Sequence, residues 1–171
     1  MARARSNVCQ WAAPVVAVNA ETGERVELKA RAVINATGTW ADTLRNEVNP
    51  ETRVRPLRGS HLVLAHSRLP VHDCLTIFHP RDKRPVFAFP WEGATVVGTT
   101  DLDHDQDPGE EATISSGELE YLLEAVTGQF PQHAITRDDI ISTWSGVRPV
   151  IGSDKSKDPS KERRTHAVWV D

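Results

Sequence analysis

The sequence predicts a mixed α/β (α+β) fold, in which a strand, a turn and a helix precede an antiparallel sheet with flanking helices. Three patterns support this prediction. An apolar run at 30–35 ends in small residues and is followed by apolar residues at helical spacing. After residue 53, short apolar runs separated by prolines and turn residues indicate antiparallel strands. Residues 116–130 place large apolar side chains on one helical face, which indicates a helix packed on a sheet.

The chain begins with strand-like segments. Residues 14–19 and 25–29 are apolar-rich runs on either side of the turn-forming residues 21–24, so they predict a β-hairpin. Residues 30–35 have an apolar centre, which predicts a strand buried on both faces, as in a parallel sheet.

The predicted strand stops at a turn of small residues, Ala36, Thr37 and Gly38. Gly38 can take a positive φ and leaves room for a bulky ligand beyond the end of a strand. Spacing alone favours the simpler alternative, a tight turn without a ligand. Residues 39–48 then predict a helix, with Thr39 as its N-cap.

The rest of the chain has the character of an antiparallel sheet. The strand-like runs are 60–65, 74–79, 85–90, 94–99, 139–144 and 165–170. The helix at 116–130 is expected to begin with a capping box formed by Ser115 and Glu118. Residues 153–164 are charged and contain almost no apolar side chains, so they predict a solvated loop.

Composition excludes several classes of partner. The chain has 171 residues, 39% hydrophobic and 26% charged, as in soluble globular proteins. A net charge of −4 with scattered basic residues does not favour nucleic acid. No apolar run is long enough to span a bilayer, and residues 6–13 are too mixed for a signal peptide. Cys9 and Cys74 have no metal-ligand spacing and are expected to be reduced thiols, which agrees with a cytoplasmic location.

Two polar residues are candidates for a functional site. His61 follows Gly59 at the start of an apolar strand, where an imidazole could act as a general base. A histidine hydrogen-bonded within a sheet is the more common alternative. Arg148 lies between Gly146 and Pro149, so its guanidinium could point into a cavity and hold a phosphate or carboxylate with two hydrogen bonds. An ordinary surface arginine is the alternative there.

Other chemistries find little support. The acidic run 101–107 resembles a calcium loop, but counting from Asp101 places Gln106 and Ala112 where glycine and glutamate are required. The seven histidines are spread out, with no HExxH or similar pair on one helical face, so no metal is expected. The motifs GxSxG, GxxxxGK[ST] and GxGxxG are all absent from the sequence.

Taken in order, the segments resemble the flavin-dependent, quinone-linked glycerol-3-phosphate dehydrogenases, within the wider superfamily of FAD oxidoreductases similar to D-amino-acid oxidase. The resemblance covers nearly the whole chain from about residue 14. GSH, then PW…GTTD, then WSGVRP in sequence point to this family in particular. The matching stretches are ARAVINATGTWAD (30–42), RPLRGSHLVL (55–64), VFAFPWEGATVVGTTD (86–101), ELEYLLEAV (118–126) and DDIISTWSGVRPV (138–150).

The resemblance implies a reaction in which FAD accepts a hydride from C2 of glycerol 3-phosphate, giving dihydroxyacetone phosphate, and electrons then pass to membrane quinone. Ala36, Thr37 and Gly38 would lie against the FAD. His61 would face the substrate hydroxyl as a base or orienting group, and Arg148 would hold the phosphate.

Asp101 would lie near the same cavity, in a role that the resemblance does not assign. The resemblance also implies a domain order. Residues 1–50 would be part of an FAD-binding Rossmann-like domain, 51–137 a substrate-binding sheet and helix, and 138–171 return strands toward the FAD domain. The protein would lie in the cytoplasm, with peripheral attachment to the cytoplasmic face of the inner membrane.

The sequence departs from the family pattern at both ends. It has no glycine-rich motif for the FAD pyrophosphate and no C-terminal helical domain, so we expect an internal piece that binds FAD weakly or not at all. Thr39 stands where relatives usually have proline. Two alternatives remain: an amine or amino-acid oxidase of the same fold, in which Arg148 would meet a carboxylate, and a non-catalytic module derived from such an enzyme.

Overall fold

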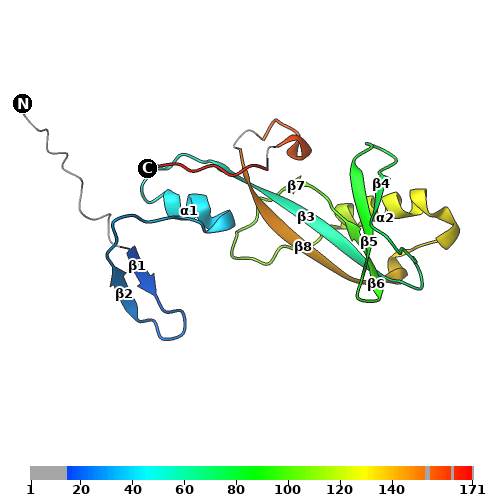
Figure 1. Ribbon diagram of the computed structural model, residues 1–171, viewed down its shortest axis with the longest axis horizontal. Helices are drawn as coiled ribbons and strands as arrows, with labels where there is room; N and C mark the ends of the chain where they lie inside the picture. The colour runs from blue at the N-terminus through cyan, green and yellow to red at the C-terminus, as the bar shows by residue number, and fades with distance from the viewer. Residues whose placement is uncertain (1–14, 153–154, 163, 171) are drawn as a thin grey trace, which may run out of the picture. The chain divides into compact units, whose positions relative to one another are not determined.

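The computed structural model describes residues 15–152, 155–162 and 164–170 (Figure 1). The chain divides into two compact units, with the boundary between Ala36 and Thr37. No helix within the described residues is long and apolar enough to cross a membrane.

The N-terminal unit contains a two-stranded antiparallel hairpin, β1 (Val15–Val18) with β2 (Arg25–Leu28). The turn is closed by Asn19, whose side-chain Oδ1 accepts a hydrogen bond from the Glu21 N–H at 2.9 Å. Side chains of this type favour turns because they hydrogen-bond to nearby backbone. The hairpin predicted from the sequence is confirmed.

The buried parallel strand expected at 30–35 is wrong. Residues 30–36 adopt no strand, and Val33 and Ile34 are 49% and 88% exposed. A parallel strand forms only through hydrogen bonds to strands beside it, and layers on both faces must cover its side chains. Within the described residues no strand pairs with this segment, so the apolar run alone does not produce the element.

The second unit is built on an antiparallel sheet, as the sequence predicts. Its strand order is β4-β5-β6-β3-β7, and β8 also pairs with β3 (Figure 1). Every pairing described in this sheet is antiparallel. The strands are β3 (Val54–Ala65), β4 (Leu75–Phe78), β5 (Pro85–Trp91), β6 (Ala94–Gly98), β7 (Leu102–Asp103) and β8 (Ile140–Ile151). The helical segments are η1 (Gly38–Trp40), α1 (Ala41–Arg45), α2 (Ser116–Gln129), η2 (Pro131–His133), η3 (Arg137–Asp139) and η4 (Pro159–Lys161).

The paired strands β3 and β8 are longer than the runs that predicted them, because two prolines do not end them. Pro56 lies directly opposite Pro149. The carbonyl of Pro56 accepts a hydrogen bond from the His104 N–H at 3.0 Å, so the polar edge of Pro56 faces β7 and not β8. A proline at such a position costs no hydrogen bond between β3 and β8, because its nitrogen points away from the partner strand.

One face of the sheet and the helix α2 form the hydrophobic core. α2 packs against β3, β4 and β6. The core includes Leu62 and Leu64 from β3, Val97 from β6, and Leu122 and Val126 from α2, each fully buried. Burying a side chain of this size stabilises the fold by about 1.5–3 kcal/mol. The apolar face predicted for this helix is therefore confirmed.

The start of α2 confirms the predicted capping box. The Ser115 side chain accepts a hydrogen bond from the Glu118 N–H, and the Glu118 carboxylate accepts one from the Ser115 N–H at 2.9 Å. By contrast, the helix expected at 39–48 reduces to η1 and the short α1, and Thr39 is not its N-cap. Leu44 is 41% exposed and Val48 is 73% exposed, so little apolar burial holds a longer helix.

The described part of the loop predicted at 153–164, residues 155–162, consists of turns and the short η4 and is mostly exposed, as expected, whereas the strand predicted at 165–170 is wrong. Residues 165–170 form no strand, and the described residues from 155 to 162 are anchored by a buried arginine. Arg55 is 2% exposed and donates to both carboxylate oxygens of Asp103, at 2.6 and 2.8 Å. It also donates to Glu162 at 3.0 Å and to the Lys157 carbonyl at 2.8 Å. The charged segment 155–162 is thus held by Arg55, a distant residue that the sequence of the segment does not indicate.

We expect Arg55→Met to lower the free energy of unfolding by about 3–5 kcal/mol, because two carboxylates would lose a buried partner. Urea denaturation followed by circular dichroism measures the change. The control is Arg137→Met, since Arg137 pairs with Glu120 where both side chains are more than half exposed. It should cost less than about 1 kcal/mol. Equal losses in the two variants would contradict the role given to Arg55.

Candidate active site

The two faces of β3 and β8 carry different kinds of side chain. Side chains alternate along a strand, so Arg58, Ser60 and Leu62 point to the α2 side of β3. Gly59 and His61 therefore lie on the opposite face. That face is more open, since Trp144 on β8 remains 50% exposed. Polar candidates from β3, β8 and the segment after β6 gather on it.

His61 is held by its two neighbouring strands. It lies opposite Gly98 on β6 and Trp144 on β8. The imidazole stacks on the Trp144 ring with centroids 3.8 Å apart and an angle of 6° between the planes. A Cβ added to Gly98 would lie 2.1 Å from the His61 ring, so only glycine leaves room for this orientation. The ring is fixed by stacking on one strand and by the missing side chain on the other.

Arg148 extends from β8 across the same face. Its Nη1 donates to Asp101 Oδ1 at 3.2 Å, and its Nη2 donates to Thr99 Oγ1 at 3.0 Å. A Cβ on Gly59 would lie 2.1 Å from Arg148 Nη2. The two glycines of this face thus make space for the two polar candidates, Gly98 for His61 and Gly59 for Arg148.

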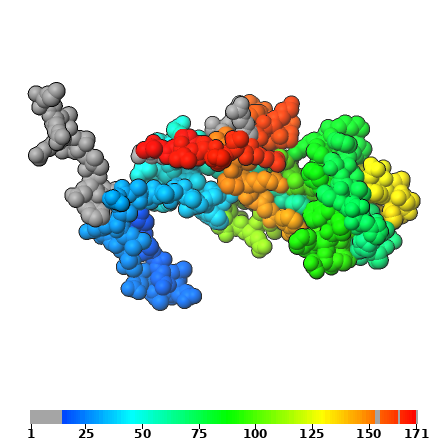
Figure 2. Space-filling model, in the orientation of Figure 1, coloured from blue at the N-terminus to red at the C-terminus, as the bar shows by residue number. Residues whose placement is uncertain are grey.

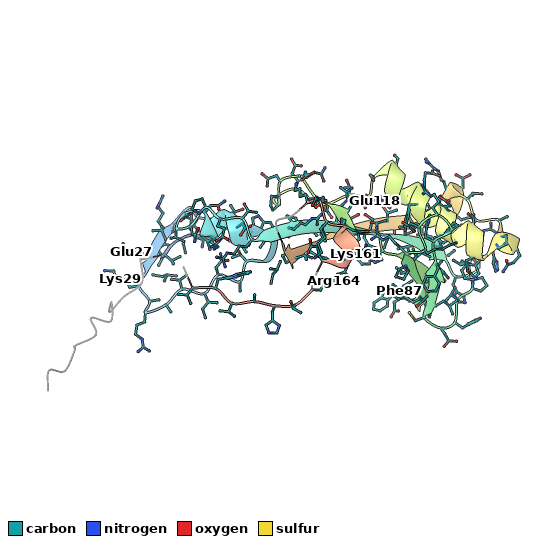
Figure 3. All side chains as sticks on the ribbon, turned by 90° about the horizontal axis from the view of Figure 1, so that it is seen from above. Glu27, Lys29, Phe87, Glu118, Lys161 and Arg164 are labelled. Carbon is teal, nitrogen blue, oxygen red and sulfur yellow. The ribbon has the colours of Figure 1, made fainter. Side chains whose placement is uncertain are left out.

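Asp101 is the centre of a cluster of cations. Its carboxylate is 4% exposed and also accepts a hydrogen bond from Arg164 Nη2 at 2.6 Å. Arg84 Nη2 lies 3.7 Å from the same oxygen. Three guanidinium groups against one carboxylate leave a net positive charge, which suits a second anion. Arg164 belongs to the C-terminal stretch, coloured red in Figure 2 and labelled in Figure 3.

Burial and charge determine the protonation of His61. Burial, and after it the positive charge of Arg148, lowers the pKa of His61 to about 4. The ring is therefore neutral at pH 7. Its Nδ1 is buried without a hydrogen-bond partner within the described residues. A neutral imidazole with an unpaired nitrogen can accept a proton.

Burial also lowers the pKa of Arg148, with Asp101 acting in the opposite direction. A guanidinium nonetheless stays charged at neutral pH. Its side chain is 30% exposed, so part of it can still reach a ligand. The pair formed by a neutral base and a fixed cation is suited to a substrate with a hydroxyl group and an anionic group.

The predicted turn of small residues has the expected backbone. Gly38 has φ +64°, and a Cβ there would meet no heavy atom within 4 Å, so its backbone can be approached closely. Thr37 precedes η1 without capping it, and Ala36 is the last residue of the N-terminal unit. A cavity of about 240 Å³ is lined in part by Thr39, the residue that follows this turn. Its lining includes Trp40 of η1 and Gly146 of β8.

Sequence reasoning missed several residues of this region. Thr99 and Trp144 lie inside the quoted motifs GTTD and WSGVRP, and alternation along the strand from Arg148 could have found Trp144. Arg84 and Arg164 lie in segments with no distinguishing pattern, and only the fold brings them to Asp101.

Comparison with known proteins gives a family and several named relatives. A family model described as FAD dependent oxidoreductase matches residues 2–170. The aerobic glycerol-3-phosphate dehydrogenase of Staphylococcus haemolyticus is 37% identical over 150 residues, which are 86% of this chain and 27% of that protein. The enzyme of the same name from Staphylococcus aureus strain USA300 is 35% identical, with the same coverage. The chain therefore spans about a quarter of the length of the curated relatives it matches.

Solved structures show the same relationship. Glycerol-3-phosphate dehydrogenase from Bacillus halodurans, complexed with FAD, has a TM-score of 0.75 and 35% identity, covering 81% of this chain and 28% of that one. Iminodiacetate oxidase from Chelativorans sp. BNC1 has a TM-score of 0.52 at 18% identity, over 82% of this chain and 38% of that one, and shows a shared fold alone. The match over residues 2–170 establishes that this chain belongs to the FAD dependent oxidoreductase family.

Proposed function

We propose that the protein containing these residues oxidises sn-glycerol 3-phosphate to dihydroxyacetone phosphate, with FAD as the hydride acceptor. One observation carries the proposal. A neutral His61 and a charged Arg148 share one face of the sheet, within a segment 35% identical to an FAD-containing glycerol-3-phosphate dehydrogenase. The substrate has a hydroxyl to deprotonate and a phosphate to bind, which matches this pair.

Arg148 would bind the phosphate. A guanidinium can offer two parallel N–H donors to a phosphate, and Arg148 is held in place by Asp101 and Thr99. Arg164 and Arg84 add positive charge beside the same carboxylate. A phosphate arriving here would compete with Asp101 for the guanidinium, so Asp101 orients Arg148 in the absence of substrate.

His61 would remove the hydroxyl proton at C2. As the C2–H bond breaks and its electron pair leaves as hydride, the O–H proton passes to the neutral imidazole and the C2–O bond becomes a ketone. Bound FAD would supply the acceptor for that hydride. Stacking on Trp144 keeps the imidazole in one orientation during the transfer.

Small residues would make the contact with the flavin. The exposed backbone at Gly38, with its positive φ and open surroundings, fits the close approach of a large planar group. Ala36 and Thr37 precede it with short side chains. In this proposal quinone would be the final acceptor of the electrons that the substrate loses. The protein is then cytoplasmic and associates peripherally with the inner membrane. Both points rest on the resemblance of the motifs.

An amine or amino-acid oxidase of the same fold is the rival. In that case Arg148 would bind a carboxylate. The identity to iminodiacetate oxidase is 18% and concerns the fold, whereas the dehydrogenases are 35–37% identical over 81–86% of this chain. Three arginines around one carboxylate also suit a doubly charged phosphate better than a single carboxylate.

We expect the pKa of His61, about 4 in the free chain, to rise when glycerol 3-phosphate binds. A phosphate near Arg148 offsets the positive charge that disfavours imidazolium. A pH titration of the histidine ring resonances by NMR, with and without ligand, measures the shift. Glycerol lacks the phosphate and should leave the titration unchanged. An unchanged pKa at saturating glycerol 3-phosphate would count against His61 as a neighbour of the substrate.

Arg148→Met should weaken binding of glycerol 3-phosphate by about 10–100-fold, since hydrogen bonds to charged groups contribute about 1.5–3 kcal/mol. Isothermal titration calorimetry of the purified chain measures the affinity. Arg137→Met, which removes an exposed arginine from η3, is the matched control and should bind like wild type.

The same samples distinguish the rival function. A small amino acid that binds as tightly as glycerol 3-phosphate would favour the oxidase. The redox step is followed by adding FAD and watching the flavin absorbance. Bleaching by glycerol 3-phosphate that is lost in Arg148→Met supports the dehydrogenase.

A further inference from the structure

Glu118 is a buried carboxylate with more hydrogen bonds than a helix cap requires. It lies near the start of α2, is 2% exposed and is labelled in Figure 3. The capping box uses one oxygen, Oε2, which accepts from the Ser115 backbone and hydroxyl at 2.9 and 2.8 Å. The other oxygen, Oε1, accepts from the hydroxyls of Ser60 at 2.8 Å and Thr100 at 2.7 Å. Arg58 Nε donates to Oε1 at 3.3 Å, and its Nη2 forms an ion pair with Oε2 at 2.8 Å.

The hydroxyls bound to Oε1 adjoin the residues of the candidate active site. Ser60 directly precedes His61 on β3. Thr100 directly precedes Asp101, and its own hydroxyl also accepts the Ser60 N–H at 2.9 Å. One oxygen of Glu118 therefore ties together the two backbone segments that carry His61 and Asp101.

The third strand joins the same network through a serine pair. Ser145 on β8 lies opposite Ser60, and their hydroxyl oxygens are 2.7 Å apart. Ser145 follows Trp144, the residue on which His61 stacks. Because side chains alternate along strands, the hydroxyls face α2 while Trp144 and His61 face the site.

We propose that Glu118 is a positioning residue, which holds β3, β8 and the segment 99–101 in place from the opposite face of the sheet. This inference rests on the function proposed above, and it identifies a residue that acts through Ser60, Thr100 and Ser145 without touching substrate. A buried helical position facing the sheet would normally hold an apolar side chain, as Leu122 does on the next turn. Capping alone does not explain the bonds to Ser60 and Thr100.

The carboxylate is charged under working conditions. Burial would raise the pKa of Glu118, but hydrogen bonds from Ser115, Thr100 and Arg58 outweigh it and lower the pKa to about 2. Hydrogen bonds to an ionised acceptor are shorter and stronger than neutral ones. The positioning network therefore persists throughout the neutral pH range.

The test compares Glu118→Gln with Glu120→Gln in the full chain. Glu120 is on the same helix, carries the same charge and is exposed beside Arg137. In Glu118→Gln we expect the His61 ring resonances to move, because stacking on Trp144 is disturbed. Affinity for glycerol 3-phosphate should fall about tenfold, equivalent to about 1.4 kcal/mol. Glu120→Gln should change neither. Circular dichroism establishes that both variants are folded.

A second pair of variants, at Thr100, tests the same proposal if Glu118→Gln does not fold. Thr100→Val removes one hydroxyl with little change in shape, and Thr100→Ser restores it. We expect Thr100→Val to move the His61 resonances and weaken binding, and Thr100→Ser to recover both. A purely structural role would lower stability without moving the His61 resonances of the folded protein.

The outcomes separate the two proposals. If wild type does not bind glycerol 3-phosphate, the proposed function fails, while the His61 resonances still decide whether Glu118 positions that ring. If folded Glu118→Gln leaves the resonances and the affinity unchanged, the positioning role is overturned. Equal effects in Glu118→Gln and Glu120→Gln would also overturn it.

Discussion

The alternation of side chains along β3 is the constraint on which the rest of the second unit depends. Leu62 and Leu64 face α2 and belong to the core, whereas Gly59 and His61 face the open side. The same strand thus supplies stability on one face and candidate chemistry on the other. A shift of register by one residue would exchange the two faces. The register of β3 with β6 and β8 is therefore a requirement for both.

Three glycines are required by the geometry of the candidate site. At Gly59 and Gly98 the structure needs the space of a missing side chain, because Arg148 and His61 fill the positions where a Cβ would lie. At Gly38 it needs a positive φ instead. The motifs GSH and GTTD are consequently informative for a steric reason. GSH contains Gly59, which leaves space for the Arg148 side chain, and GTTD contains Gly98, which leaves space for the His61 ring.

Local pattern predicts a good part of this fold. Turn chemistry identified the hairpin at β1 and β2, and the apolar face and capping box identified α2. His61, Arg148 and Asp101 were also selected from the sequence, and the fold brings all three together. What pattern could not supply is the identity of distant partners. The apolar run 30–35 has the pattern of a buried strand, but it forms no strand because no other strand pairs with it within the described residues. The sequence predicts only a capping role for Glu118. Its hydrogen bonds to Ser60 and Thr100 depend on the packing of α2 on the sheet.

The pairing of β3 with β8 has a consequence for how this unit folds. Residues at 54–64 pair with residues at 151–140, so the two strands are far apart in the sequence. Contacts of such long range close slowly, since chain entropy is lost before they form. During synthesis, β3 emerges well before β8 and has one edge unpaired until the last third of the unit has been made. Pro149 lies opposite Pro56, so its nitrogen faces the edge of β8 away from β3, where a missing N–H discourages pairing with another chain.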